Sequence, residues 1–239
     1  MEGLGDILRG IAEYKEEQIK PRQIREILPM ERWLDSEYYV GPSGMRLYPY
    51  WKEALNKVFN STGDTKITEV IVTGGEYIRA GAFYGCVNIK SVTLPDGVKH
   101  IGYYAFQGCT SLEYIRIPDS VTIIYDSAFQ DCVSLQEVIL PANLITISPS
   151  AFKGCIELSS ITIPVNVTFI AGAAFSGCVN LTTIYLERPS SAGITALGIN
   201  VFLGCNAISD IFVPDNASEA VYRGAAGWLI FGTKIKAIV

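Results

Sequence analysis

This chain of 239 residues is 49% apolar and 18% charged, so it has enough apolar side chains to build a core and is unlike a disordered protein. Its 24 acidic residues outnumber its 19 basic ones, which argues against a nucleic-acid or acidic-membrane binder, since such proteins normally carry a basic patch. No apolar run reaches the roughly 18 residues that a membrane-spanning helix needs. The composition therefore predicts a folded protein that binds no nucleic acid and has no transmembrane segment.

The first residues, from Met1 to Leu8, include acidic side chains and lack the basic stretch and apolar run of a secretory signal. If this N-terminus is the native one, we expect the protein to stay in the cytoplasm. The sequence leaves the oligomeric state open.

The pattern Ala-Phe-x-x-Cys recurs along the chain at a fixed spacing of 23 residues. Five copies keep this spacing, and they begin at Ala82, Ala105, Ala128, Ala151 and Ala174. A sixth copy, Val201-Phe202-x-x-Cys205, follows after 27 residues, so four residues are inserted around 189–198. A fixed period of this length is typical of repeat proteins, in which each unit forms one supersecondary element of a stacked array.

Within each unit, a short apolar–polar alternation precedes a proline, as in Ile115-x-Ile117-Pro118. Alternating β-branched residues predict a short strand with one buried face. Proline ends that strand because it has no N–H for the ladder, and it recurs at positions 95, 118, 141, 164 and 214. One unit cannot bury its apolar side alone, but stacked units can, so the pattern predicts a repeat solenoid with a parallel β array of 23-residue coils.

The unit Leu-x-x-Ile-x-Ile-Pro, followed by Val-x-x-Ile-x-x-x-Ala-Phe-x-x-Cys, resembles the leucine-rich repeats of the BspA-like family of bacterial surface and secreted proteins. The resemblance covers residues 66–214 and implies a leucine-rich-repeat fold. The segment around Trp228 and Phe231 looks like the capping end of that family's arrays. We therefore expect repeats over 63–214 and a C-terminal cap over 215–239. Ile67-x-x-Val70-x-Val72 lacks the proline and is about one residue short, so it is interpreted as a degenerate first coil.

Residues 1–62 do not contain the repeat, and their apolar residues fall near helical spacing, for example at Ile7, Leu8 and Ile11 and again at Ile24 and Ile27. Prolines 21 and 29 divide this region. The spacing predicts a short α-helical N-terminal segment, and one role for such a segment is to cap the first coil.

Stretches 23–29, 36–42 and 48–52 look similar to the N-terminal region of phage terminase large subunits. In a terminase, a phosphate-binding loop would follow the next strand. Here residues 74–81 contain no Gly-Lys-Ser/Thr ending, so nothing is placed to hold the β- and γ-phosphates or magnesium. This resemblance implies an alternative hypothesis: a phage-packaging relic fused to the repeats, without ATPase activity.

Three residue types could support chemistry. Five of the six cysteines share one register, which predicts a column of small buried thiols, and the absence of a C-x-x-C spacing argues against zinc. The single histidine, His100, precedes an inward isoleucine, so we expect it to point to solvent, with no activated nucleophile beside it. Glu113 and Glu137 could approach each other as a carboxylate pair, but solvated surface acids are the more ordinary interpretation. We therefore predict no enzyme activity, no cofactor and no metal.

The outward positions of the predicted strands vary from coil to coil while the inward frame stays constant. Such a pattern is expected of a recognition surface on a rigid scaffold. The candidate partner-binding residues are Lys90, Thr93, Glu113, Tyr114, Arg116, Gln136, Glu137, Thr162, Thr183, Tyr185, Asp210 and Phe212. Tyrosine and arginine are enriched among interface anchors, although aromatic residues and threonine also favour strands for their own sake. The sequence thus predicts a non-catalytic module that binds a protein or a glycan.

Overall fold

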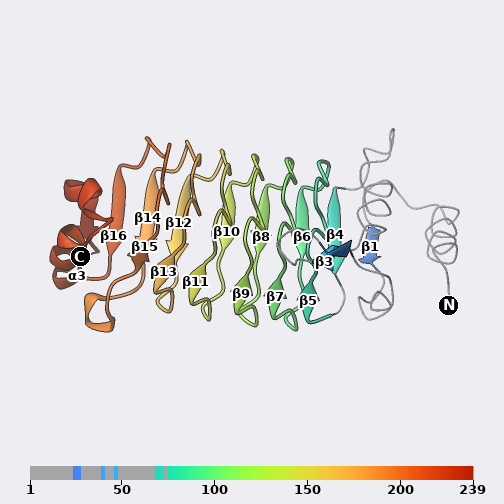
Figure 1. Cartoon of the computed structure of the whole chain (residues 1–239), viewed down its shortest axis with the longest axis horizontal. Coiled ribbons are helices and arrows are strands. Elements are labelled where there is room, and N and C mark those ends of the chain that lie inside the picture. The colour runs from blue at the N-terminus through green and yellow to red at the C-terminus, as the bar shows by residue number, and fades with distance from the viewer. Residues whose placement is uncertain (1–23, 28–38, 41–45, 48–67, 73–74, 239) are drawn as a thin grey trace, which may run out of the picture.

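The computed structural model describes residues 24–27, 39–40, 46–47, 68–72 and 75–238. Over this part of the chain, the repeats form an elongated solenoid of parallel strands, with α3 (Asn216–Gly224) at the C-terminal end (Figure 1). This architecture confirms the predicted repeat solenoid.

Each coil contributes one strand to a front layer and one to a back layer. The front layer consists of β4 (Glu69–Val72), β6 (Ser91–Thr93), β8 (Tyr114–Arg116), β10 (Glu137–Ile139), β12 (Ser160–Ile163), β14 (Thr183–Leu186), β16 (Asp210–Val213) and β17 (Ile235–Ala237). The back layer consists of β5 (Tyr77–Ile78), β7 (His100–Ile101), β9 (Ile123–Ile124), β11 (Thr146–Ile147), β13 (Phe169–Ile170) and β15 (Ala196–Leu197). All the pairings within these layers are parallel.

The hydrogen-bonded ladders divide each layer into two sheets. In the front layer the sheets are β1-β4-β6-β8-β10, where β1 is Ile24–Ile27, and β12-β14-β16-β17; in the back layer they are β5-β7-β9 and β11-β13-β15. The coil that contains β10 and β11 is therefore laddered to the preceding coil through its front strand and to the following coil through its back strand. The front ladder is interrupted between β10 and β12, and the back ladder between β9 and β11. Each pair of neighbouring coils therefore still shares at least one of the two ladders.

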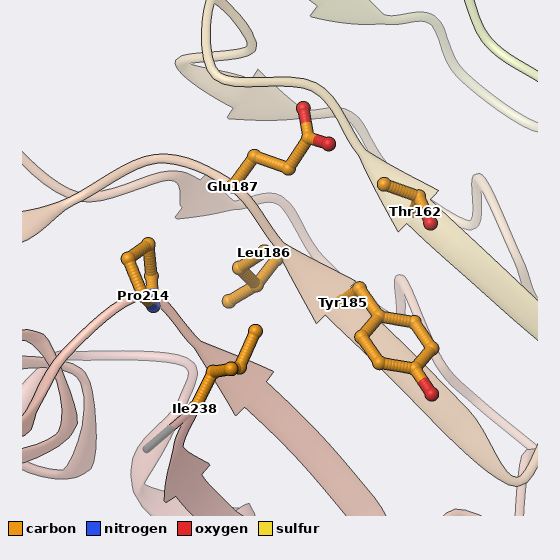
Figure 2. Close-up of a pocket in the computed structure, with 6 residues that line it drawn as sticks. All are labelled: Thr162, Tyr185, Leu186, Glu187, Pro214 and Ile238. Carbon is orange, nitrogen blue, oxygen red and sulfur yellow. The ribbon is translucent and has the colours of Figure 1, made fainter.

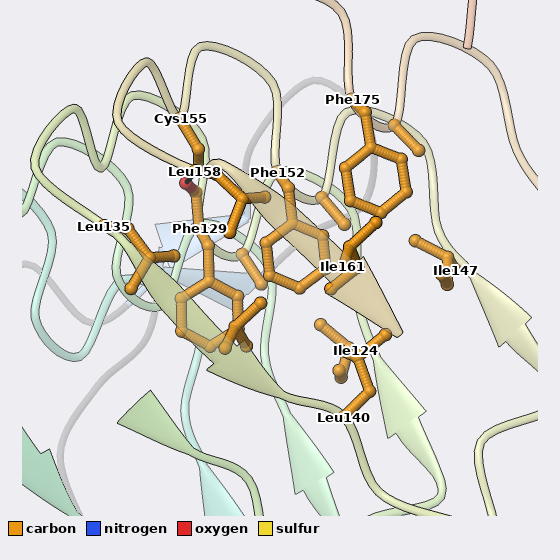
Figure 3. Packing of buried hydrophobic residues seen from close by; sticks show 14 of the residues in the cluster. Ile124, Phe129, Leu135, Leu140, Ile147, Phe152, Cys155, Leu158, Ile161 and Phe175 are labelled. Atoms are coloured by element: carbon orange, nitrogen blue, oxygen red, sulfur yellow. Dashed lines mark hydrogen bonds between the residues drawn. The ribbon is translucent and has the colours of Figure 1, made fainter. Parts of the chain in front are cut away.

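Residues that share a register position stack along the solenoid axis and form the core. The clearest example is a file of phenylalanine rings, with neighbouring centroids 4.9–5.6 Å apart and ring planes within 2–8° of parallel. The file contains Phe83, Phe106, Phe129, Phe152, Phe175 and Phe202, and part of it is drawn in Figure 3. This ring spacing follows the spacing of strands in a sheet, roughly 4.8 Å, so the backbone ladder sets the stack.

The cysteines form a second buried column, as predicted. All six are free thiols, and all are buried. From Cys109 onwards, each thiol donates to the backbone carbonyl of the phenylalanine in the preceding coil, with Sγ···O distances of 3.0–3.3 Å. Cysteine suits this position because it is small and apolar and also supplies a weak donor for a buried carbonyl.

Proline ends most of the front strands, and Glu187 is an informative exception. Pro118, Pro141 and Pro164 are buried where the chain leaves the front layer. In the next coil Glu187 stands at this position, and its N–H donates to the carbonyl of Ile163 at 3.0 Å. A proline could not make that bond. The N–H of Glu187 therefore adds one hydrogen bond to the pairing of β14 with β12, beyond Leu186.

The inserted residues predicted around 189–198 contact the C-terminal helix and the segment that follows it. They include a short 3-10 helix, Ser190–Ala192. Because of the insertion, Phe169 in β13 pairs with Ala196 in β15, a residue more than 23 positions later in the sequence. The backbone N–H of Thr195 donates to Tyr222 Oη at 2.9 Å, and the Trp228 indole donates to the carbonyl of Thr195 at 2.7 Å. The insertion thus supplies the polar partners for two aromatic side chains that are fully buried.

The edge of the last strand is covered by side chains of α3. Strand β17 pairs in parallel with β16, so it extends the front layer beyond the last Ala-Phe copy. The Arg223 guanidinium donates to the carbonyl of Ile235 at 2.8 and 3.1 Å, and the Ala237 N–H donates to Glu219 Oε2 at 2.8 Å. An open strand edge is a template for pairing with another chain, and these two side chains occupy it instead.

The N-terminal prediction is wrong for one short stretch. Residues Ile24–Ile27 form strand β1, which lies parallel to β4 with Ile24 opposite Val70. The spacing of the two isoleucines suits a helix, but β-branched residues also favour strands, and the edge of β4 offers backbone partners. Strands β2 (Tyr39–Val40) and β3 (Arg46–Leu47) pair antiparallel. The remaining predicted helices of 1–62 lie outside the described residues.

Replacing one ring of the phenylalanine file tests the stacked core. We expect Phe129→Ala to lower the free energy of unfolding by about 3–5 kcal/mol, because it leaves a cavity between two neighbouring rings. Phe169→Ala is the matched control, since Phe169 is 39% exposed on the back layer, and we expect a loss of about 1 kcal/mol or less. The measurement is urea unfolding followed by circular dichroism. Equal losses in the two variants would contradict a continuous buried file.

Removing the carboxylate that covers the last strand tests the edge contacts. We expect Glu219→Ala to speed hydrogen exchange of the Ala237 amide by about tenfold, since a hydrogen bond to a charged acceptor contributes about 1.5 kcal/mol or more. The control is Glu157→Ala, which removes an exposed carboxylate elsewhere. Amide exchange read by NMR distinguishes the two, and an unchanged Ala237 rate would show that solvent already reaches this edge.

Candidate binding surface

The front face is defined by the side chains that the front layer points away from the core. In β8, Tyr114 and Arg116 are exposed on either side of the fully buried Ile115. The register arranges these side chains in columns along the solenoid. One column holds Glu69, Ser91, Tyr114, Glu137, Ser160, Thr183 and Asp210, and the other holds Ile71, Thr93, Arg116, Ile139, Thr162, Tyr185, Phe212 and Lys236.

All twelve candidate residues lie on this face or directly before its strands. Nine are exposed, whereas Thr183, Asp210 and Phe212 are half-buried. Tyr114 and Tyr185 are separated by three coils, so roughly 14 Å of sheet lies between the two aromatic positions. The face is therefore long enough to contact an extended partner at two separate places.

The N-terminal part of the face carries most of its charge. Lys90 and Glu113, which precede neighbouring strands, form an ion pair with an Nζ···Oε1 distance of 2.8 Å. Both side chains are about half exposed, at 55% and 48%, so the pair adds little to stability. Because Glu113 is paired with lysine, it is not one half of a carboxylate pair with Glu137. The geometry suits complementary contacts with a charged partner.

The C-terminal part of the face is built from hydroxyl and aromatic side chains. Tyr185 and Phe212 stack with ring centroids 5.2 Å apart and planes 18° from parallel. Asp210 forms an ion pair with Lys236 and accepts a hydrogen bond from Ser209 Oγ at 2.7 Å. The lysine, and then the serine, hold the pKa of Asp210 below its usual range, so this carboxylate is ionised at neutral pH.

A shallow pocket of about 360 Å³ opens beside this aromatic stack (Figure 2). It is lined by Thr162, Tyr185, Leu186, Glu187, Pro214 and Ile238. Sequence reasoning selected only Thr162 and Tyr185 from this set. Glu187 and Ile238 stand at the proline position of their coils, so their deviation from the repeat was the available signal. Lys236 was missed for a related reason, because Ile235-x-Ala237 was assigned to the cap and not to a further strand.

The position of His100 differs from the expectation of a solvent-facing side chain. Its ring stacks on Tyr77 at 5.1 Å and lies 6.4 Å from Tyr125, and the residue is half-buried. Two aromatic neighbours on the back layer account for this burial. In the part of the chain that the structure describes, Nδ1 of His100 is buried without a hydrogen-bond partner.

The described residues contain neither a cluster of metal ligands nor a helix that could span a membrane. No three or more histidine, cysteine, aspartate or glutamate side chains are grouped there in a way that could hold a metal ion. Within the same residues, no helix has both the length and the apolar character needed to cross a membrane.

The sequence of the coils matches a known family of repeat proteins. A family model described as "BspA type Leucine rich repeat region" matches six copies over residues 76–209, which is more than half of the chain. The chain belongs to this family. Leucine-rich repeats of the BspA type are commonly protein-binding modules, and their homologues are generally not enzymes.

Solved structures of other leucine-rich-repeat proteins are similar to this BspA-type chain. A leucine-rich repeat protein from Bacteroides ovatus is 31% identical, with a TM-score of 0.50 over 65% of this chain and 51% of its own. The leucine-rich repeat protein of T. pallidum is 24% identical, with a TM-score of 0.48 over 80% of this chain and 94% of its own. This chain thus spans about half the length of the B. ovatus protein. Among curated proteins, no match was found.

The resemblance of residues 1–62 to phage terminases receives no support from these comparisons. The BspA-type match begins at residue 76, after the segment in question. Most of the stretches that suggested a terminase lie outside the described residues.

The cysteine column makes a prediction about thiol reactivity. Burial raises the pKa of Cys86 to about 12 and also raises the pKa of Cys109, Cys132 and Cys155. These thiols therefore stay protonated at about pH 8, and since the thiolate is the nucleophile, iodoacetamide should leave them unmodified in the folded chain. Mass spectrometry after alkylation, with and without guanidinium chloride, measures this. Modification of Cys132 at the same rate in both samples would contradict the buried column.

Proposed function

We propose that this chain is a non-catalytic binding module that recognises a protein partner through the front face of its repeats, with a glycan as the alternative ligand. The observation that carries the proposal is the register of the front layer. It holds the inward residues of successive strands directly over one another while the outward residues change from coil to coil. A rigid frame with variable exposed side chains is how loops and faces acquire specificity.

The composition of the face supports a protein ligand. Tyr114, Tyr185 and Arg116 are exposed, and these residue types supply much of the binding energy in protein interfaces. Exposed Ile71 and Ile139 add apolar area between the charged side chains. The face therefore combines apolar, aromatic and charged groups, as protein interfaces do.

The same proposal includes the division of the chain. Repeats over 63–214 would present the face, and residues 215–239 would cap the last coil. Its supports are the aromatic contacts of Trp228 and Phe231 with Phe202 and the covered edge of β17. No observation in the described residues favours the phage-packaging alternative.

The test is partner capture from the native host with the full chain and two triple variants. The front-face variant replaces Tyr114, Arg116 and Tyr185 with alanine. The matched back-face variant replaces Tyr77, Ile123 and Phe169, which are also exposed, with alanine. We expect the front-face variant to lose at least about 90% of the captured partner, since the loss of three anchor residues weakens binding by about 2 kcal/mol or more. We expect the back-face variant to retain it.

Circular dichroism of both variants checks that the fold is kept. Capture by the front-face variant at the wild-type level would show that the partner binds elsewhere. If a purified glycan competes with the captured material, the ligand is a glycan.

A further inference from the structure

The pocket beside Tyr185 lies where the repeat departs from its own pattern. Its rim is formed by the turn position that follows the front strands. Four earlier coils have proline at this position. Here it holds Glu187 after β14, Pro214 after β16 and Ile238 after β17. Glu187 and Ile238 each donate a backbone N–H to the preceding coil, to Ile163 at 3.0 Å and to Val213 at 2.8 Å. These bonds hold both residues in line with the sheet, so their side chains have defined positions around the pocket.

The walls of the pocket are apolar and aromatic. Leu186 forms the buried floor, while Pro214 and Ile238 stand on one side and the Tyr185 ring on the other (Figure 2). Ile238 is 54% exposed, which is unusual for a side chain that lines a concave surface and could be covered by a ligand. A volume of about 360 Å³ is at the small end of the range for ligand pockets. The pocket therefore suits one long side chain better than a large group.

Glu187 is the one charged residue among the six that line the pocket. Among the described residues, the Glu187 carboxylate has no ion pair and no hydrogen bond. The guanidinium of the neighbouring Arg188 donates to the carbonyls of Val165 and Ala192 and forms no ion pair with Glu187. Directly after Pro214, the Asp215 carboxylate caps α3 by accepting the Ser218 N–H at 2.7 Å. The nearest lysine on the front face, Lys236, is already paired with Asp210.

We propose that this pocket binds a positively charged side chain, lysine or arginine, of the partner segment that lies on the front face. The apolar walls would cover the methylene stem of that side chain, in the way that long basic residues bury their stems while their charged heads stay in water. The Cα atoms of residues two positions apart in an extended chain, such as Tyr185 and Glu187, are roughly 7 Å apart, so a cation beside the carboxylate can place its stem near the ring. The inference rests on the proposed front-face function and adds the class of residue that the partner must contain.

The decisive probe is a pair of small amides that differ only in charge. N-acetyl-lysine methylamide carries the ammonium group, and N-acetyl-norleucine methylamide has the same apolar stem without it. Both are titrated into the full chain, and the Ile238 methyl and Tyr185 ring signals are followed by NMR. We expect saturable shifts with the lysine probe, and at least about fivefold weaker binding of the norleucine probe.

Variants assign the effect to the proposed groups. We expect Glu187→Gln to weaken the lysine probe about threefold and to leave the norleucine probe unchanged, because only the charge is removed. Tyr185→Leu should weaken the lysine probe by a similar factor. Glu157→Gln, which removes an exposed carboxylate elsewhere, should leave both probes unchanged.

Three results would overturn the proposal: equal binding of the two amides, no effect of Glu187→Gln, or no saturable shift of Ile238. These outcomes are separate from failure of the proposed function. The amides report on the pocket without any partner, whereas the capture experiment reports on the front face as a whole. A chain whose front-face variant loses its partner but whose pocket ignores the lysine probe would retain the binding function and lose this assignment.

Discussion

The structure depends on one constraint, the direct stacking of residues that share a register position in successive coils. Parallel ladders hold neighbouring strands at roughly 4.8 Å, and the side chains must pack at that spacing. The phenylalanine rings respond by lying almost parallel, with centroids 4.9–5.6 Å apart. The cysteine thiols fill the space beside them and donate to the carbonyls of the phenylalanines. Because every coil packs against its neighbour through the same positions, the core runs continuously along the solenoid axis.

A stacked array leaves its last coil with an apolar side and an open strand edge, and the C-terminal part of the chain addresses both. Trp228 and Phe231 cover Phe202, and Glu219 and Arg223 occupy polar groups of β17. The inserted residues before β15 supply the hydrogen bonds that the buried Tyr222 and Trp228 require. Among the described residues, the inserted segment, α3 and β17 are therefore irregular features that lie together at the C-terminal end.

The same irregularities shape the candidate binding surface. Regular coils give the front face its flat columns of exposed side chains. The loss of proline at Glu187 and the extra strand β17 add a pocket with apolar walls and an unpaired carboxylate. A partner on this face would meet charged groups near β6 and β8, and aromatic and hydroxyl groups near β14 and β16. The two ends of the face therefore differ in chemistry.

The spacing of Ala-Phe-x-x-Cys determined the solenoid, the parallel strands, the buried thiol column and the outward direction of all twelve candidate residues, because a strict repeat makes every coil predict the next. The features that only the tertiary structure decided lie where the repeat fails. Ile24–Ile27 forms a strand because the edge of β4 offers backbone partners, and His100 is half-buried because Tyr77 and Tyr125 enclose it. β17 lies beyond the last Ala-Phe-x-x-Cys copy, and the pocket at Glu187 forms only because residues of β12, of β14 and of the turns after β16 and β17 meet in space. Periodicity predicts what each coil does to its neighbour, whereas the ends and exceptions depend on distant segments meeting in space.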